Sequence, residues 1–162
     1  MNLLNNKADF SAGVTVIKNF SNITIINSKF ANNKAGVSGG VIMIANSTNI
    51  TINNSLFHHN AANWEGGVMI ALTQCIVSVN GCRFLNNTAF FRGGAIKTGS
   101  ESDVIVFNSE FTNNKAGYGG AVAIQHSTNI TIVVLQTMQN NNVPRFLIIV
   151  KFGTTLQCMV QF

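Results

Sequence analysis

The stretch Phe84–Ile96, FLNNTAFFRGGAI, contains a pattern that recurs along the chain. A Phe is followed three residues later by an Asn, five residues later by an Ala and nine residues later by a Gly pair. The Phe returns at a fixed interval of 27 positions, at Phe30, Phe57, Phe84 and Phe111, and the Asn returns with it, at Asn33, Asn60, Asn87 and Asn114. Gly pairs stand at 39–40, 66–67 and 93–94, and a fourth pair, at 119–120, comes one residue early. A fixed period of this length indicates a repeat protein.

Within each repeat, apolar and polar residues alternate with the period of two that is typical of strands. Val77–Val79 and Val104–Val106 show this alternation, and turns rich in Asn and Gly separate such segments. Three short strands per repeat fit one coil of a parallel β-helix, in which coils stack about 4.8 Å apart. We therefore predict an all-β parallel β-helix of about five to six coils of 27 residues. Helical repeats are the alternative, but these Gly-rich and β-branched segments argue against them.

Residues 27 positions apart lie above one another in such a fold. The four repeated Phe residues are therefore expected to stack inside the helix, where each ring pair adds about 0.5–1.5 kcal/mol. The four repeated Asn residues are expected to form the turns and to bond from coil to coil. We interpret both sets as structural ladders.

The pattern covers residues 1–142, with partial coils at both ends, and residues 143–162 depart from it. We expect this divergent C-terminal segment to be a cap or a final strand. We also expect it to cover apolar positions that follow each Gly pair and that simple alternation directs outward, namely Val41, Val68, Ala95 and Ala121. Because the chain starts in mid-repeat, we expect it to be part of a longer protein whose adjoining coils pack against it.

The paired motifs FLNN with GGAI, and FTNN with GGAV, resemble the repeats of the chlamydial polymorphic outer-membrane proteins. Two other pairs, FANN with GGVI and FHHN with GGVM, have Val in place of the Ala. The resemblance covers roughly residues 1 to 142. It implies a right-handed parallel β-helix like an autotransporter passenger, forming a surface-exposed, adhesin-like stalk. An extracellular or cell-surface location, at the outer membrane if the source is bacterial, follows from the resemblance alone.

Composition excludes several other classes of protein. The net charge is +5, but the ten basic residues are scattered, so nucleic-acid binding is not expected. No apolar run is long enough to span a bilayer, so no transmembrane segment is expected. Three Cys is an odd number, which argues against a closed disulfide framework.

Few residues in the chain suit catalysis. β-Helix enzymes that cut acidic polysaccharides need clustered carboxylates, and this chain has five acids, at Asp9, Glu65, Glu101, Asp103 and Glu110. Glu110 occupies the position of Arg83 one repeat later, which predicts a surface ion pair. His58 and His59 replace turn residues, and Cys75 and Cys82 replace small ones. We predict no catalytic, cofactor-binding or metal-binding residue, and no cofactor.

The remaining candidates concern binding and modification. Trp64 and Tyr118 lie between the Asn and the Gly pair, where they are candidates to contact a sugar or a partner. Asn86 and Asn129 begin Asn-x-Thr sequons and are candidate glycosylation acceptors if the source is eukaryotic. The sequence thus favours a non-enzymatic secreted or surface segment, an adhesin-like stalk or binding scaffold that contacts a host-surface protein or carbohydrate. The alternative is a segment of a carbohydrate-active enzyme that resembles a polysaccharide lyase or a glycoside hydrolase.

Overall fold

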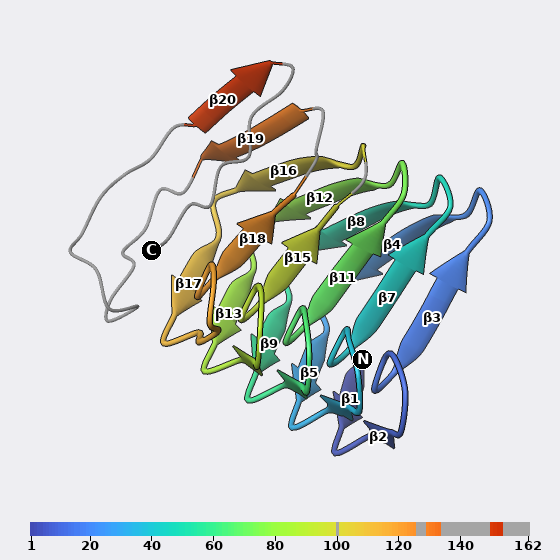
Figure 1. Ribbon diagram of the computed structural model, residues 1–162, viewed down its shortest axis with the longest axis vertical. Coiled ribbons are helices and arrows are strands. Elements are labelled where there is room, and N and C mark those ends of the chain that lie inside the picture. The colour runs from blue at the N-terminus through green and yellow to red at the C-terminus, as the bar shows by residue number, and fades with distance from the viewer. Residues whose placement is uncertain (100, 126–128, 134–149, 154–162) are drawn as a thin grey trace.

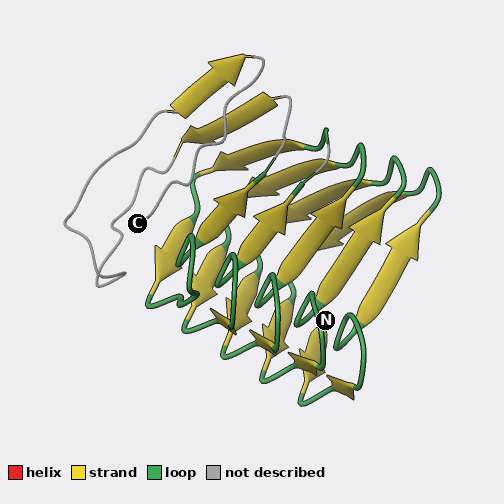
Figure 2. Cartoon of the chain, in the orientation of Figure 1, coloured by secondary structure: helices red, strands yellow, loops and turns green. Residues whose placement is uncertain are grey.

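The chain winds into a stack of coils in which corresponding segments lie side by side (Figure 1). This computed structural model describes residues 1–99 and 101–125 in full, and the backbone of 129–133 and 150–153. All the elements in these residues are strands, joined by turns and loops (Figure 2).

Each of the first four coils contributes one strand to each of four sheets, which we name A to D, and the fifth contributes to A, C and D. Sheet A carries the repeated Phe and consists of β1 (Asn2–Leu4), β5 (Lys29–Ala31), β9 (Leu56–His58), β13 (Arg83–Leu85) and β17 (Glu110–Thr112). Sheet B consists of the two-residue strands β2 (Lys7–Ala8), β6 (Lys34–Ala35), β10 (Ala61–Ala62) and β14 (Thr88–Ala89).

The other two sheets are longer. Sheet C follows the Gly pairs and consists of β3 (Thr15–Lys18), β7 (Ile42–Ala45), β11 (Met69–Leu72), β15 (Ile96–Thr98) and β18 (Val122–Ile124). Sheet D consists of β4 (Asn22–Ile26), β8 (Asn49–Asn53), β12 (Ile76–Asn80), β16 (Asp103–Phe107), β19 (Asn129–Val133) and β20 (Val150–Gly153).

The strand register confirms the predicted parallel β-helix and its period. Phe57 pairs with Phe30 of the coil before and with Phe84 of the coil after, and the strands are parallel. This shift of 27 positions falls to 26 into the last coil, where Ile96 pairs with Val122. The first four coils also have a fourth strand each, in sheet B, which the predicted three strands omitted. These strands hold only two residues, too few for an alternating pattern to reveal them.

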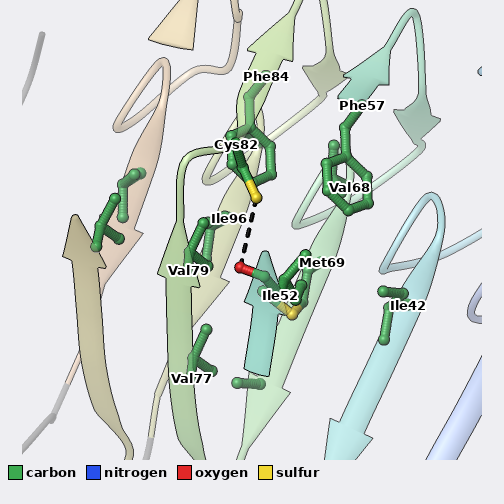
Figure 3. Close-up of a cluster of buried hydrophobic side chains, with 14 of the residues drawn as sticks. Ile42, Ile52, Phe57, Val68, Met69, Val77, Val79, Cys82, Phe84 and Ile96 are labelled. Carbon is green, nitrogen blue, oxygen red and sulfur yellow. Dashed lines mark hydrogen bonds between the residues drawn. The ribbon is translucent and has the colours of Figure 1, made fainter. Parts of the chain in front are cut away.

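The four Phe side chains stack along the centre of the helix. Successive ring centroids lie 4.8, 4.9 and 4.6 Å apart, with interplanar angles of 3° to 5°. All four rings are buried, and Figure 3 shows Phe57 and Phe84 among the Ile, Val and Met side chains of the neighbouring strands. The distance between successive rings therefore matches the distance of about 4.8 Å between neighbouring strands, so each of these coils can place one ring in the stack.

The four Asn residues form a continuous ladder of buried hydrogen bonds. The backbone N–H and the side-chain amide of Asn60 both donate to Oδ1 of Asn87, at 3.0 Å. The amide of Asn60 also donates to the carbonyl of Phe30, at 3.1 Å. Asn33 and Asn87 make the corresponding bonds to the next Asn along the helix. Each Asn thus satisfies backbone groups that the turn would otherwise bury unpaired.

The Gly pairs form a tight corner before sheet C. The first Gly of each pair has a positive φ, 65° at Gly66, and a Cβ on the second would collide with the carbonyl of the next coil's second Gly, as Gly67 would with Gly94. The bend turns the residue after the pair into the core. The expectation that Val41, Val68, Ala95 and Ala121 face outward is therefore wrong, since all four are fully buried in the hydrophobic core cluster with the repeated Phe.

Three outward positions of sheet C are covered by the chain's own corners. Ile70, Lys97 and Ala123 are only 3% to 6% exposed. A Cβ at Gly39 would lie 3.2 Å from a methyl group of Ile70, so the corner itself packs over the start of the sheet. Val16, at the same position in the first coil, is 47% exposed, so the face is buried in the later coils only. That the C-terminal segment covers this face stays a prediction.

Part of the C-terminal segment adds a strand to sheet D. β20 pairs with β19, and this pairing is antiparallel, whereas the other strands of the sheet are parallel. Most of residues 143–162 lie outside the described residues. The role of this segment as a cap stays a prediction.

Replacing Asn87 with Ala is expected to lower the free energy of unfolding by about 3 kcal/mol, since it strips partners from several buried polar groups at once. Among these groups are the backbone N–H of Asn60 and the carbonyl of Phe57. Urea denaturation followed by circular dichroism measures the change. Asn63→Ala, at an exposed loop position, is the control and is expected to shift stability by less than about 0.5 kcal/mol. Equal effects of the two substitutions would contradict a structural role for the ladder.

Candidate binding surface

The loops between sheet B and sheet C lie above one another and form a row along one edge of the helix (Figure 1). One residue per coil occupies the same position in this row: Phe10, Val37, Trp64, Phe91 and Tyr118. The backbone N–H of each donates to the carbonyl of the one before it, at 2.7 to 2.8 Å. These hydrogen bonds hold the loops in register, so their side chains repeat at the coil spacing.

Most side chains in this row are apolar and exposed. Phe10 is 79% exposed, and Val37, Trp64 and Tyr118 are between 41% and 46% exposed. In the fourth coil the neighbouring Phe90 takes the outer place and is 73% exposed. We call the six residues Phe10, Val37, Trp64, Phe90, Phe91 and Tyr118 the apolar edge. A cluster of exposed apolar side chains along one edge is typical of an interaction surface.

Three of these rings pack against one another. The rings of Trp64 and Phe91 stack with centroids 4.8 Å apart, and the ring of Tyr118 meets Phe91 edge-on at 5.4 Å. The guanidinium carbon of Arg92 lies 4.2 Å from the centroid of Phe91. The structure thus brings Trp64 and Tyr118 together through Phe91, and the ring faces of Phe91 are occupied within the protein.

A network of ion pairs links the loops that carry the apolar edge. Glu65 pairs with Arg92 at 3.2 Å and with Lys97 at 3.8 Å, which ties the loop of one coil to the loop and strand of the next. Glu65 and Lys97 are both buried. Burial lowers the pKa of Lys97 below the ordinary lysine range, Glu65 opposes this shift, and the charge of Arg92 adds to it.

The last described loop is one residue shorter than the others. Tyr118 pairs with Arg92 as a backbone bridge, and its carbonyl accepts the hydrogen bond of Gly93, which is the part that Arg92 plays for Gly66. Tyr118 therefore makes the backbone contacts of two residues. Its N–H bonds to Phe91 as the other residues of the row do, and its carbonyl bonds to Gly93 as that of Arg92 does to Gly66. This places the early Gly pair in the same corner as the others.

The other sequence candidates lie away from the apolar edge. The predicted ion pair between Arg83 and Glu110 is confirmed, at 2.7 Å on sheet A. Burial alone would raise the pKa of Glu110, but hydrogen bonds from Arg83 and Thr112 outweigh it and lower the pKa below its ordinary value. Glu101 accepts a hydrogen bond from Gln74, at 3.1 Å.

The described histidine and cysteine side chains form no evident chemical centre. Nδ1 of His58 lies 3.0 Å from Nδ1 of His59. Within the described ranges, no group of three or more His, Cys, Asp or Glu side chains is placed to hold a metal ion. Burial raises the pKa of both Cys75 and Cys82, and Cys82 bonds to the carbonyl of Ile52 (Figure 3). A thiol held in its neutral form is a poor nucleophile.

The structure describes the side chain of one glycosylation candidate and only the backbone of the other. Asn86 is half-buried in a turn, with a φ of 55°, and its backbone N–H donates to the carbonyl of Thr112. Asn129 begins β19, where only the backbone is described. Glycosylation at either residue stays a prediction.

Sequence reasoning found Trp64 and Tyr118 but missed the rest of the edge. Counting the 27-residue period backward and forward from Trp64 gives Val37, Phe10 and Phe91, so the signal was present. Glu65 and Arg92 are also one period apart, so their ion pair carried the same signal as that of Arg83 and Glu110. Lys97 had no such signal, because it lies at a different repeat position.

The structure also bears on membrane crossing by helices. No helical segment in the parts of the chain that the structure describes has the length and hydropathy that crossing a bilayer requires.

The stability of the protein is expected to rise with pH in the alkaline range because of Lys97. Its pKa is lower in the folded than in the unfolded chain, so between these two values the unfolded chain binds more protons and folding is favoured as pH rises. The slope cannot exceed about 1.4 kcal/mol per pH unit, the limit for one proton. Urea denaturation between about pH 8 and pH 10.5 measures it. Lys97→Met is expected to remove this contribution; an unchanged slope would contradict the assignment.

The comparisons with known proteins agree with the geometry. No significant match to the chain was found among the curated proteins or among the solved structures. A family model described as the right-handed beta helix region matches residues 2–134, well over half of the chain. The stacked parallel coils and this match together show that the chain belongs to the right-handed β-helix family.

Proposed function

We propose that this β-helix is a non-enzymatic binding scaffold that acts outside the cell or at its surface, with the apolar edge as its binding surface. The observation that carries the proposal is the row of exposed apolar side chains, one per coil, held on a hydrogen-bonded backbone. Solvent-exposed rings on a rigid support are typical of binding surfaces, because little freedom is lost when a partner docks.

The proposed extracellular location and adhesin-like role are supported by the resemblance of the sequence motifs. The motif pairs FLNN with GGAI and FTNN with GGAV resemble repeats of surface-exposed polymorphic outer-membrane proteins. The partners expected from this resemblance are components of a host surface, protein or carbohydrate. Adjoining coils of a longer chain belong to the same proposal, since Leu3, Val14 and Ile23 in the first coil are only partly buried against the core.

Binding of the fluorescently labelled chain to a panel of intact bacterial and animal cells tests the proposal. The double substitution Trp64→Ser, Phe90→Ser is expected to weaken binding about 30-fold, as the loss of an aromatic anchor does at other interfaces. Phe20→Ser is the matched control, because Phe20 is 82% exposed but lies in the turn between β3 and β4.

Two results would contradict the proposal. One is cell binding that the double variant and the control retain equally. The other is release of oligosaccharides from a panel of polysaccharides by the purified chain, which would favour the carbohydrate-active enzyme instead.

A further inference from the structure

Three lysines lie beside the apolar edge, in the first, second and fifth coils, whereas Ala61 and Thr88 hold the same position in the third and fourth. Lys7, Lys34 and Lys115 occupy the outward position of sheet B or its continuation, three residues before the apolar position of the loop, and all three are exposed. Three residues span at most about 10 Å of chain, so the charges and the apolar side chains lie along the same edge. We call these three residues the basic row.

The charges of the basic row are not balanced by ion pairs among the described residues. Lys7 and Lys34 pair directly in register, and like charges placed opposite each other in a sheet repel. The salt bridges within the described residues involve Arg83, Arg92 and Lys97, and none involves the basic row. Glu65 is neutralised by Arg92 and Lys97, which leaves Asp9 as the other carboxylate in these loops. The excess positive charge indicates an anionic partner.

The packing of the rings decides which kind of anionic partner fits. Sugar rings bind on exposed aromatic faces, with polar groups placed beside them. Here Trp64 stacks on Phe91, and Arg92 and Tyr118 also pack against Phe91, so ring faces are used within the protein. Phe10, Val37 and Phe90 supply no hydrogen-bonding groups. The apolar edge and the basic row therefore fit the hydrocarbon and the anionic headgroups of a lipid bilayer better than they fit a glycan.

We propose that the apolar edge and the basic row together dock on an anionic lipid surface, an inference that rests on the proposed function of the edge as the binding surface. Trp and Tyr favour the membrane interface, where one part of the ring is apolar and the other is wet. Lysines near such a surface bind anionic headgroups and bury their methylene stems. The β-helix then lies along the membrane without crossing it.

The geometry suits contact along a line. Five coils place the edge residues over about 19 Å, four steps of about 4.8 Å each. Phe10 and Phe90 are the most exposed side chains of the edge and insert deepest. Because the loops are joined by backbone hydrogen bonds, all five present their side chains together without rearrangement.

Trp64 is the one tryptophan of the chain and reports directly on this contact. The test uses the whole chain with vesicles of phosphatidylcholine alone, or of phosphatidylcholine with phosphatidylserine. Anionic vesicles are expected to shift Trp64 emission to the blue, and lipids brominated near the headgroup are expected to quench it. Lys7→Gln, Lys34→Gln and Lys115→Gln are each expected to weaken vesicle binding about five-fold, the factor expected for one lysine near such a surface.

Matched controls separate the edge from general charge and hydrophobicity. Phe90→Ser is expected to weaken vesicle binding at least ten-fold, whereas Phe20→Ser, Lys18→Gln and Lys29→Gln, all exposed and away from the edge, are expected to leave it within two-fold. Circular dichroism spectra that match the unsubstituted chain show that each variant is folded.

Three results would overturn the inference. Trp64 emission that does not change with anionic vesicles is the first, and equal binding to both kinds of vesicle is the second. The third is cell binding that depends on the edge and is abolished by removing surface glycans or proteins but not by masking anionic lipid; that result would leave the proposed function intact and assign the edge to another class of partner.

Discussion

The structure depends on one constraint: every coil must present its backbone groups in register with the coils on both sides. Strands of a few residues contribute little individually, and no described coil has a core of its own. The shared register lets the Phe rings stack at 4.6 to 4.9 Å and lets each Asn amide reach the next. The register therefore comes first, and the core and the turns follow from it.

The sequence was sufficient to predict the fold because that register is periodic. Phe57 and Asn60 recur with the same period, and a recurring pair of different residues has few structural explanations. The direction of side chains at the corners was not predictable in the same way. Val68 follows Gly67, where the carbonyl of Gly94 leaves no room for a Cβ. The bend at this glycine turns the side chain of Val68 into the core, and a simple alternation of inward and outward residues does not predict that.

The candidate surface was only partly predictable, for a related reason. Trp64 and Tyr118 stood out as rare residue types, whereas Val37 is a common residue type that belongs to the apolar edge only by its repeat position. Lys97 is harder still. Its side chain is buried, and its ammonium group pairs with Glu65. A pattern of residue types shows neither the burial nor the pairing. Repetition therefore reveals the scaffold, and the departures from repetition need the three-dimensional structure.

The loop that carries Tyr118 is shorter than its neighbours, and yet the stack continues through it. Tyr118 makes two sets of backbone contacts at the edge, and sheets C and D continue beyond the shorter loop, where Ile96 pairs with Val122 and Val104 pairs with Ile130. A loop at this edge can thus differ in length by one residue while the strand pairing of sheets C and D continues. The edge can therefore vary in length and in residue type without a change in the strands that support it.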